Sequence, residues 1–188
     1  MKRKLYGASL LLFITLLLLL PLSPPARASA QEGGKRDHLT AEEIELVRAA
    51  QILDVRMAVF IKAADRRLLV LTNPDAASSR QVEKDMKKWG ELPRGTRTEL
   101  LDDMAKILDE ASTNIDDLGA RDPNNPMLPK ALQMLADAST RFLSTLKPMR
   151  SHAEGAEREA LEQAIENAQL IVEAADRLPT DSKSPQKK

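Results

Sequence analysis

The sequence predicts an all-α protein, an up-down antiparallel four-helix bundle with one additional short helix at about residues 74–89, preceded by a signal peptide. Apolar residues recur at coiled-coil-like steps of three and four along four long segments, the period of helices with one buried face. Only short connections, rich in turn residues, separate these segments. The chain has few aromatic residues and 7 glycines in 188 residues, which favours helices over sheets.

The first 30 residues have the three parts of a secretory signal peptide. Residues 2–4 form a basic start, residues 10–20 form an apolar run, and residues 28–30 (Ala-Ser-Ala) provide a cleavage site. The run is short against the ~20 residues that a membrane-spanning helix needs, which favours cleavage over an anchor. We therefore expect a secreted or periplasmic protein without stable membrane insertion after cleavage.

Removal of residues 1–30 changes the charge balance. The full chain has 28 basic and 28 acidic residues, and the segment removed holds four basic ones, so 24 basic and 28 acidic residues remain. This balance gives no general attraction to nucleic acid. Without cysteine, the fold depends on its core alone. We expect a flexible lead-in over 31–39, a single helical bundle domain over 40–178 and a disordered basic tail over 179–188.

The clearest helix start is at Thr40. Thr40 and Glu43 have the spacing of a capping box, and Leu39 and Ile44 have that of a hydrophobic staple. The helical pattern continues to Leu71, shortly before a proline that ends it. We expect one continuous helix over this span. Its inner stripe, which Arg67 interrupts, consists of Leu46, Ala50, Leu53, Met57, Phe60, Ala64 and Leu71.

A short helix and a long helix come next. The helix of about residues 74–89 has proline at its first position and ends at Gly90, a residue suited to the position after a helix. A second capping box, formed by Thr96 and Glu99, begins a long helix that runs to about residue 119.

Two more long helices complete the expected bundle. A dense cluster of helix-breaking residues over 122–126 precedes a helix that reaches about Lys147. The last helix is expected to start at a third capping box, Ser151 with Glu154, and to end near Leu178.

The sequence indicates no enzyme. It has no cysteine, no G-x-S-x-G motif and no glycine-rich phosphate loop. His38 and His152 belong to no metal-binding motif, so we expect neither a metal nor a cofactor. A b-type haem held by His152 with Met57 or Met104 is the alternative that the residue types allow, although methionines on a core stripe usually fill space.

Acidic pairs recur every seven residues on the helix that begins after Thr96. They directly follow core positions, so we expect them to point outward in a strip about 22 Å long. A solvated outer face explains this pattern, and a docking strip for a basic partner or for divalent cations is the functional alternative. This acidic strip consists of Asp102, Asp103, Asp109, Glu110, Asp116 and Asp117.

The helix expected over residues 40–71 also has apolar residues on the side away from the bundle. The short helix that follows it could cover them, or they could form an interface with a partner or a second copy. These observations favour an exported, non-enzymatic helical-bundle protein that acts through protein–protein contact, as scaffold, adaptor or self-associating module. The residues of this outer face are Ile52, Val55, Val59 and Leu69.

Overall fold

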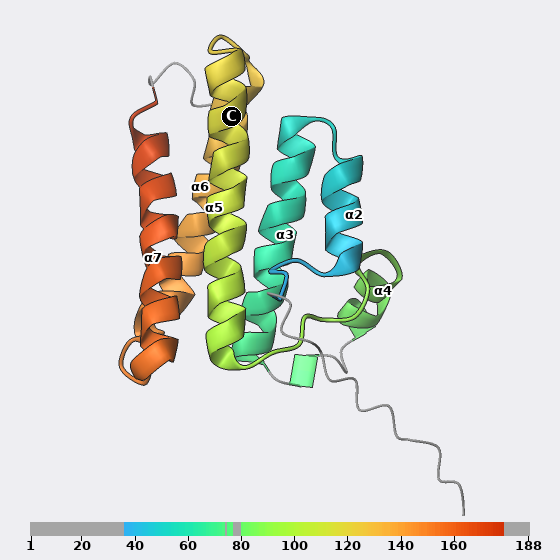
Figure 1. The fold of residues 1–188 in the computed structure, drawn as a ribbon, viewed down its shortest axis with the longest axis vertical. Helices are drawn as coiled ribbons and strands as arrows, with labels where there is room; N and C mark the ends of the chain where they lie inside the picture. Colours follow the sequence, from blue (N-terminus) through green and yellow to red (C-terminus); the bar gives the residue numbers. More distant parts are fainter. Residues whose placement is uncertain (1–35, 74, 77–79, 179–188) are drawn as a thin grey trace, which may run out of the picture. The chain divides into compact units, whose positions relative to one another are not determined.

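The computed structural model describes residues 36–73, 75–76 and 80–178, and this part of the chain is all helical, without a strand (Figure 1). The expected signal peptide, most of the lead-in and the tail lie outside the described residues. No helix within the described residues is long and apolar enough to cross a membrane. The helices are α2 (Ala41–Ala49), α3 (Leu53–Thr72), α4 (Arg80–Trp89), α5 (Arg97–Arg121), α6 (Met127–Met149) and α7 (Gly155–Asp176).

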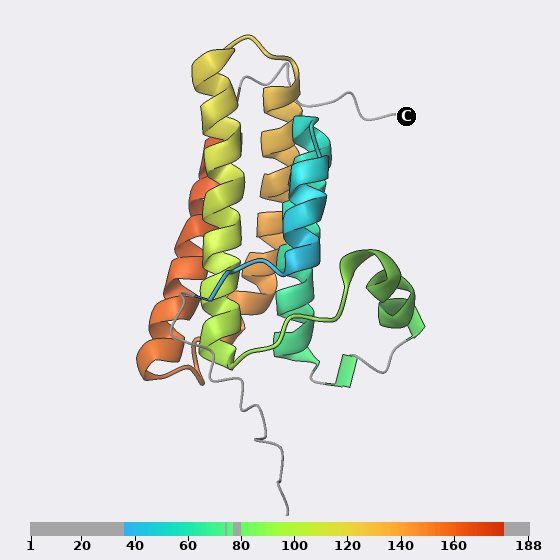
Figure 2. The same ribbon diagram turned by 45° about the vertical axis from the view of Figure 1, so that its right-hand side comes forward.

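The expected continuous helix over 40–71 is wrong, because the chain folds back on itself between α2 and α3. α2 ends at Ala49, α3 begins at Leu53, and the two helices lie side by side (Figures 1 and 2). The turn contains neither glycine nor proline, and side chains stabilise it instead. Arg56 Nε donates to the Ala50 carbonyl at 2.9 Å, and Gln51 Nε2 donates to the Arg48 carbonyl at 2.6 Å.

Two of the three predicted capping boxes are present. At the starts of α2 and α5, the threonine hydroxyl accepts from the backbone N–H three residues on, and the glutamate there accepts from the threonine N–H. These signals are local, so tertiary packing did not have to create them.

The third capping box is wrong. α6 continues through Pro148 to Met149, and the chain needs a further turn before α7. Ser151 lies in this turn, where its hydroxyl donates to the Pro148 carbonyl at 3.0 Å. Glu154 is therefore itself the residue that precedes α7, and its side chain makes no capping hydrogen bond.

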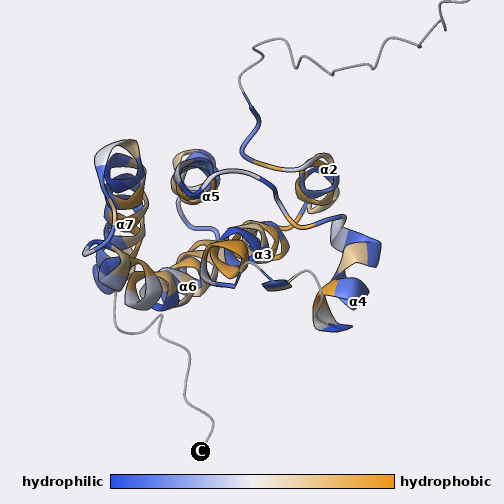
Figure 3. Cartoon of the chain, turned by 90° about the horizontal axis from the view of Figure 1, so that it is seen from below, coloured by the Kyte–Doolittle hydropathy of each residue, from blue (hydrophilic) through white to orange (hydrophobic). Residues whose placement is uncertain are grey.

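Helices α3, α5, α6 and α7 share one apolar core. α7 packs against α5 and α6, and α3 packs against the same two helices from the other side (Figure 3). α5 and α6 lie across the core from each other and touch only slightly, so the connection over 122–126 crosses one end of the core. The chain reverses direction between α5 and α6 and again between α6 and α7, so the neighbouring helices α5 and α7 run in the same direction (Figure 1). The largest fully buried apolar residues are Met57, Phe60, Leu101, Met104, Ile107, Leu108, Leu135, Phe142, Leu146, Leu161 and Ile165.

Helix α4 lies outside this core, beside α2 and α3 (Figures 2 and 3). It is described from Arg80 onwards, and the expected start at residue 74 lies outside the described residues. Trp89, at its end, is buried in a second, small apolar cluster with Ala50 and Val59. Near its middle, the Asp85 carboxylate accepts from Lys62 Nζ of α3 at 2.6 Å.

Candidate functional site

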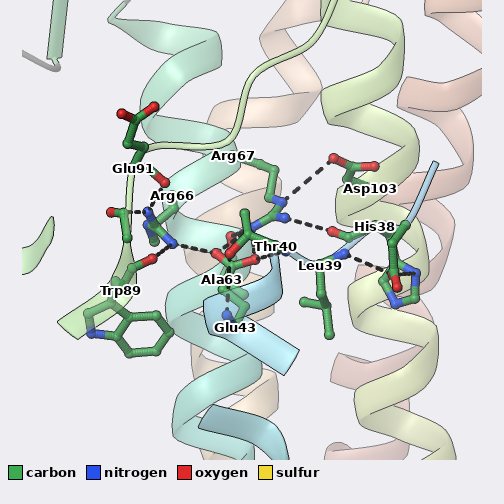
Figure 4. A network of polar contacts seen from close by, with 12 residues as sticks. His38, Leu39, Thr40, Glu43, Ala63, Arg66, Arg67, Trp89, Glu91 and Asp103 are labelled. Carbon is green, nitrogen blue, oxygen red and sulfur yellow. Dashed lines mark hydrogen bonds and ion pairs between the residues drawn. The ribbon is translucent and has the colours of Figure 1, made fainter. Parts of the chain in front are cut away.

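A network of buried charged side chains connects α2, α3, α5 and the segment between α4 and α5 (Figure 4). We call it the buried ion network. Its members come from positions far apart in the sequence, so the tertiary fold alone brings them together. They are Glu43 of α2, Arg66 and Arg67 of α3, and Asp103 of α5, each no more than 4% exposed.

Glu43 is the centre of the network. Its carboxylate accepts from Arg66 Nη1 at 2.7 Å, and both of its oxygens lie 2.6 Å from Arg67 Nη1. One of these oxygens also accepts from the Thr40 N–H at 3.0 Å as part of the capping box. The same side chain therefore starts α2 and fixes that helix to α3.

Arg66 binds the end of α4. Its Nη1 donates to the Trp89 carbonyl at 2.8 Å, and its Nη2 donates to the carbonyls of Gly90 at 3.0 Å and of Glu91. The last carbonyls of a helix have no partner within the helix, and the negative end of its dipole favours a cation there. Burial lowers the pKa of Arg66, and the nearby carboxylate of Glu43 opposes this shift.

Arg67 fixes the segment that precedes α2. Its Nη2 donates to the His38 carbonyl at 2.7 Å, and its Nε lies 3.8 Å from Asp103 Oδ2. Arg36 Nη2 donates to the same Asp103 oxygen at 2.9 Å. Burial raises the pKa of Asp103, while the positive charges of Arg36 and Arg67 oppose that shift.

The network acts as a structural clamp. Both oxygens of Glu43 and all terminal nitrogens of Arg66 and Arg67 are bound within the protein. None of these groups is open to a substrate. Because a buried charge without its partner is costly, the clamp ties the positions of α2 and α4 to α3.

The six residues of the acidic strip differ in burial and in their partners. Asp103 is buried in the network, so the expectation that all six residues point outward is wrong for it. Glu110 Oε2 lies 2.7 Å from His38 Nε2, and Asp102 pairs with Lys106. The segment before α2 crosses α5 here and covers part of the strip, which the heptad pattern of α5 does not reveal. The exposed members are Asp109, Asp116 and Asp117.

The four residues of the outer face also differ in their exposure. Val59 is buried beneath Trp89, whereas Ile52 and Val55 are 58% and 49% exposed beside the turn between α2 and α3. Leu69 is half-buried and lines a cavity of about 270 Å³ between α3 and α4. The folded-back α2 and the end of α4 thus cover the middle of this face and leave one end open.

The residues considered for haem lie in different surroundings. His152 is exposed between α6 and α7, whereas Met57 and Met104 are fully buried in the core. Among the described residues, no group of three or more His, Asp or Glu side chains is placed to hold a metal ion.

One feature of the sequence indicates the network indirectly. Arg67 interrupts an otherwise apolar inner stripe, and a long cation at a core position requires a buried partner. The pattern did not identify Glu43, because a glutamate three residues after Thr40 is already explained by the capping box.

Comparison of the chain with protein-family models, curated proteins and solved structures finds no match.

Proposed function

We propose that this is an exported, non-enzymatic protein that acts through protein–protein contact, as scaffold, adaptor or self-associating module. In this proposal α3, α5, α6 and α7 form a four-helix bundle, and α2 and α4 are additions to one side of it. The observation that carries the proposal is the exposed apolar pair Ile52 and Val55, beside the turn between α2 and α3.

The position of this pair supports a contact role. Ile52 directly precedes α3, and Val55 lies three residues further on, so both fall on the same side of the helix. Arg56 binds the Ala50 carbonyl and, at 3.0 Å, Asn114 Oδ1 of α5. Because these bonds and the buried ion network hold α2 in place, a partner meets a surface whose shape is already fixed, which lowers the entropy cost of binding.

Site-specific photo-crosslinking in the producing cell tests the contact. A photoreactive amino acid replaces Ile52, and in a matched strain it replaces Ser144, an exposed residue of α6. We expect one defined crosslinked product from position 52, either a second copy or one protein, and its loss when Val55→Lys is added. Equal capture from both positions, or capture that Val55→Lys leaves unchanged, would contradict the proposed contact.

Export has its own support and its own test. The basic start, the apolar run and the small residues at 28–30 support removal of a signal peptide. N-terminal sequencing of the protein isolated from the producing cell should give a start at Gln31. A chain that retains residues 1–30 and stays in the cytoplasm would refute export.

A further inference from the structure

A second surface, on the side formed by α5 and α7, combines an apolar floor with carboxylates. Two adjoining cavities of about 290 and 570 Å³ lie there and share Ile115, Asp116 and Leu132. We call them together the α5–α7 groove. Asp109 and Asp116 come from one face of α5, and Leu170, which is 55% exposed, comes from α7.

The charge of the groove has one sign. Asp109 and Asp116 are the charged residues among the described residues that line it. Neither carboxylate forms an ion pair with another described residue, unlike Asp102 and Glu110 elsewhere on α5. A partner that brings positive charge therefore gains two ion pairs without breaking existing ones, whereas phosphate groups and acidic segments are repelled.

The dimensions of the groove fit a helix. Asp109 and Asp116 are seven residues apart on α5, which places them about 10.5 Å apart along its axis. A helix that lies along α5 has the same rise, so basic residues seven apart on it meet both carboxylates. Along α5 the lining extends from Asp109 to Gly119, a length of about 15 Å, or roughly ten helical residues.

We infer that the α5–α7 groove binds an amphipathic helix of a partner protein, with apolar residues on one face and lysine or arginine residues seven apart beside them. A second copy of this chain is a poorer occupant. Its α4 has Arg80 and Lys87 at this spacing, but Val82 and Trp89, from the apolar face of the same helix, are buried in its own fold. The inference rests on the proposed function, since both concern protein contacts, but it concerns a surface separate from Ile52 and Val55.

The test uses the full chain and a synthetic peptide. The probe is a peptide of about 16 residues made of Leu, Ala and Lys, with leucines at helical spacing and lysines seven apart; in the control peptide, glutamate replaces each lysine. Isothermal titration calorimetry should show saturable binding of the lysine peptide, weakened by added salt, and none of the glutamate peptide. Equal binding of both peptides, or of neither, overturns the inference.

Variants locate the binding. Asp109→Asn with Asp116→Asn should weaken the lysine peptide about 2- to 30-fold, the range for loss of two exposed ion pairs. The matched control, Glu159→Gln with Glu166→Gln, removes the same charge from exposed positions seven apart on α7 that do not line the groove, and should leave the affinity unchanged. Equal weakening by both pairs would show attraction to overall charge only and overturn the inference.

Two further measurements test the contribution of apolar contacts to peptide binding and whether a second copy of the chain occupies the groove. Leu170→Gln should also weaken the lysine peptide, because it removes exposed apolar surface from the groove. Light scattering should give the same mass for wild type and the Asp109→Asn, Asp116→Asn variant. A dimer that this variant dissociates would assign the groove to a second copy instead. If the peptide fails while crosslinking from position 52 succeeds, the groove inference alone falls.

Discussion

Replacement of Glu43 by glutamine tests whether ion pairing in the buried network holds α2 and α4 to α3. The change removes the negative charge that Arg66 and Arg67 share at 2.6–2.7 Å. Glutamine has nearly the same size and keeps a carbonyl oxygen that can accept from the Thr40 N–H. Glu43 is 0% exposed, so water cannot bind Arg66 and Arg67 in place of the lost carboxylate.

The expected cost follows from burial. Removal of one partner from a buried ion pair costs about 3–5 kcal/mol. Because glutamine still offers one acceptor to the two arginines, we expect the lower end of this range, a decrease of about 3 kcal/mol in the free energy of unfolding. This is a large part of the ~5–15 kcal/mol that stabilises an ordinary domain.

The second capping box provides a matched control. Glu99 occupies the same position in α5 as Glu43 does in α2, but it is exposed and has no buried arginine as partner. Glu99→Gln should therefore cost less than about 0.5 kcal/mol. Urea unfolding followed by circular dichroism at 222 nm measures both variants. Equal losses of stability would refute the role of ion pairing and leave the capping box as the whole contribution of Glu43.

Three further predictions concern the segments that the network holds. Gly90→Ala should destabilise the protein by about 1–2 kcal/mol in urea unfolding, because Gly90 has φ +68° and a Cβ there would lie 2.7 Å from Glu42 Cδ. Arg66→Lys should shift the fluorescence emission of Trp89, the single tryptophan of the chain, to longer wavelength while helix content is retained, because lysine cannot bind all three carbonyls at the end of α4. Burial raises the pKa of Asp103 above 3.8, so the native state binds more protons than the unfolded state, and stability falls as pH rises from 3.8 through the raised pKa. Asp103→Asn should remove this part of the pH dependence in urea titrations at several pH values.

Each of these predictions has a control in the same chain. Gly119→Ala, inside α5 where a Cβ would make ordinary van der Waals contact with Leu128, should stabilise rather than destabilise. Arg141→Lys, at an exposed arginine, should leave the tryptophan emission unchanged. Asp117→Asn, at an exposed position near the other end of α5, should preserve the pH slope. An Asp103→Asn variant with the wild-type slope would contradict the assigned role of burial, and an unshifted emission in Arg66→Lys would contradict the clamp on α4.

The outer face shows that a sequence pattern does not determine which of its apolar residues become buried. Ile52, Val55 and Val59 have the same hydrophobic character and the same helical side, so the sequence treats them alike. In the structure Val59 is buried under Trp89, while the other two remain exposed. The difference arises from the position of α2 and of the end of α4, which the buried ion network ties to α3 through Arg66.

The sequence by itself determined the features that depend on neighbouring residues. The helical class, the starts of α2 and α5 and the buried stripes through Phe60, Leu108 and Leu161 follow from capping and from the 3.6-residue period, because both act within a few turns of one helix. Tertiary structure alone decided the break between α2 and α3, the burial of Asp103 and the partners of Arg67. The charged partners of Asp103 and Arg67 are 24 to 67 residues away in the chain, and a helical period carries no information about which distant charge lies opposite.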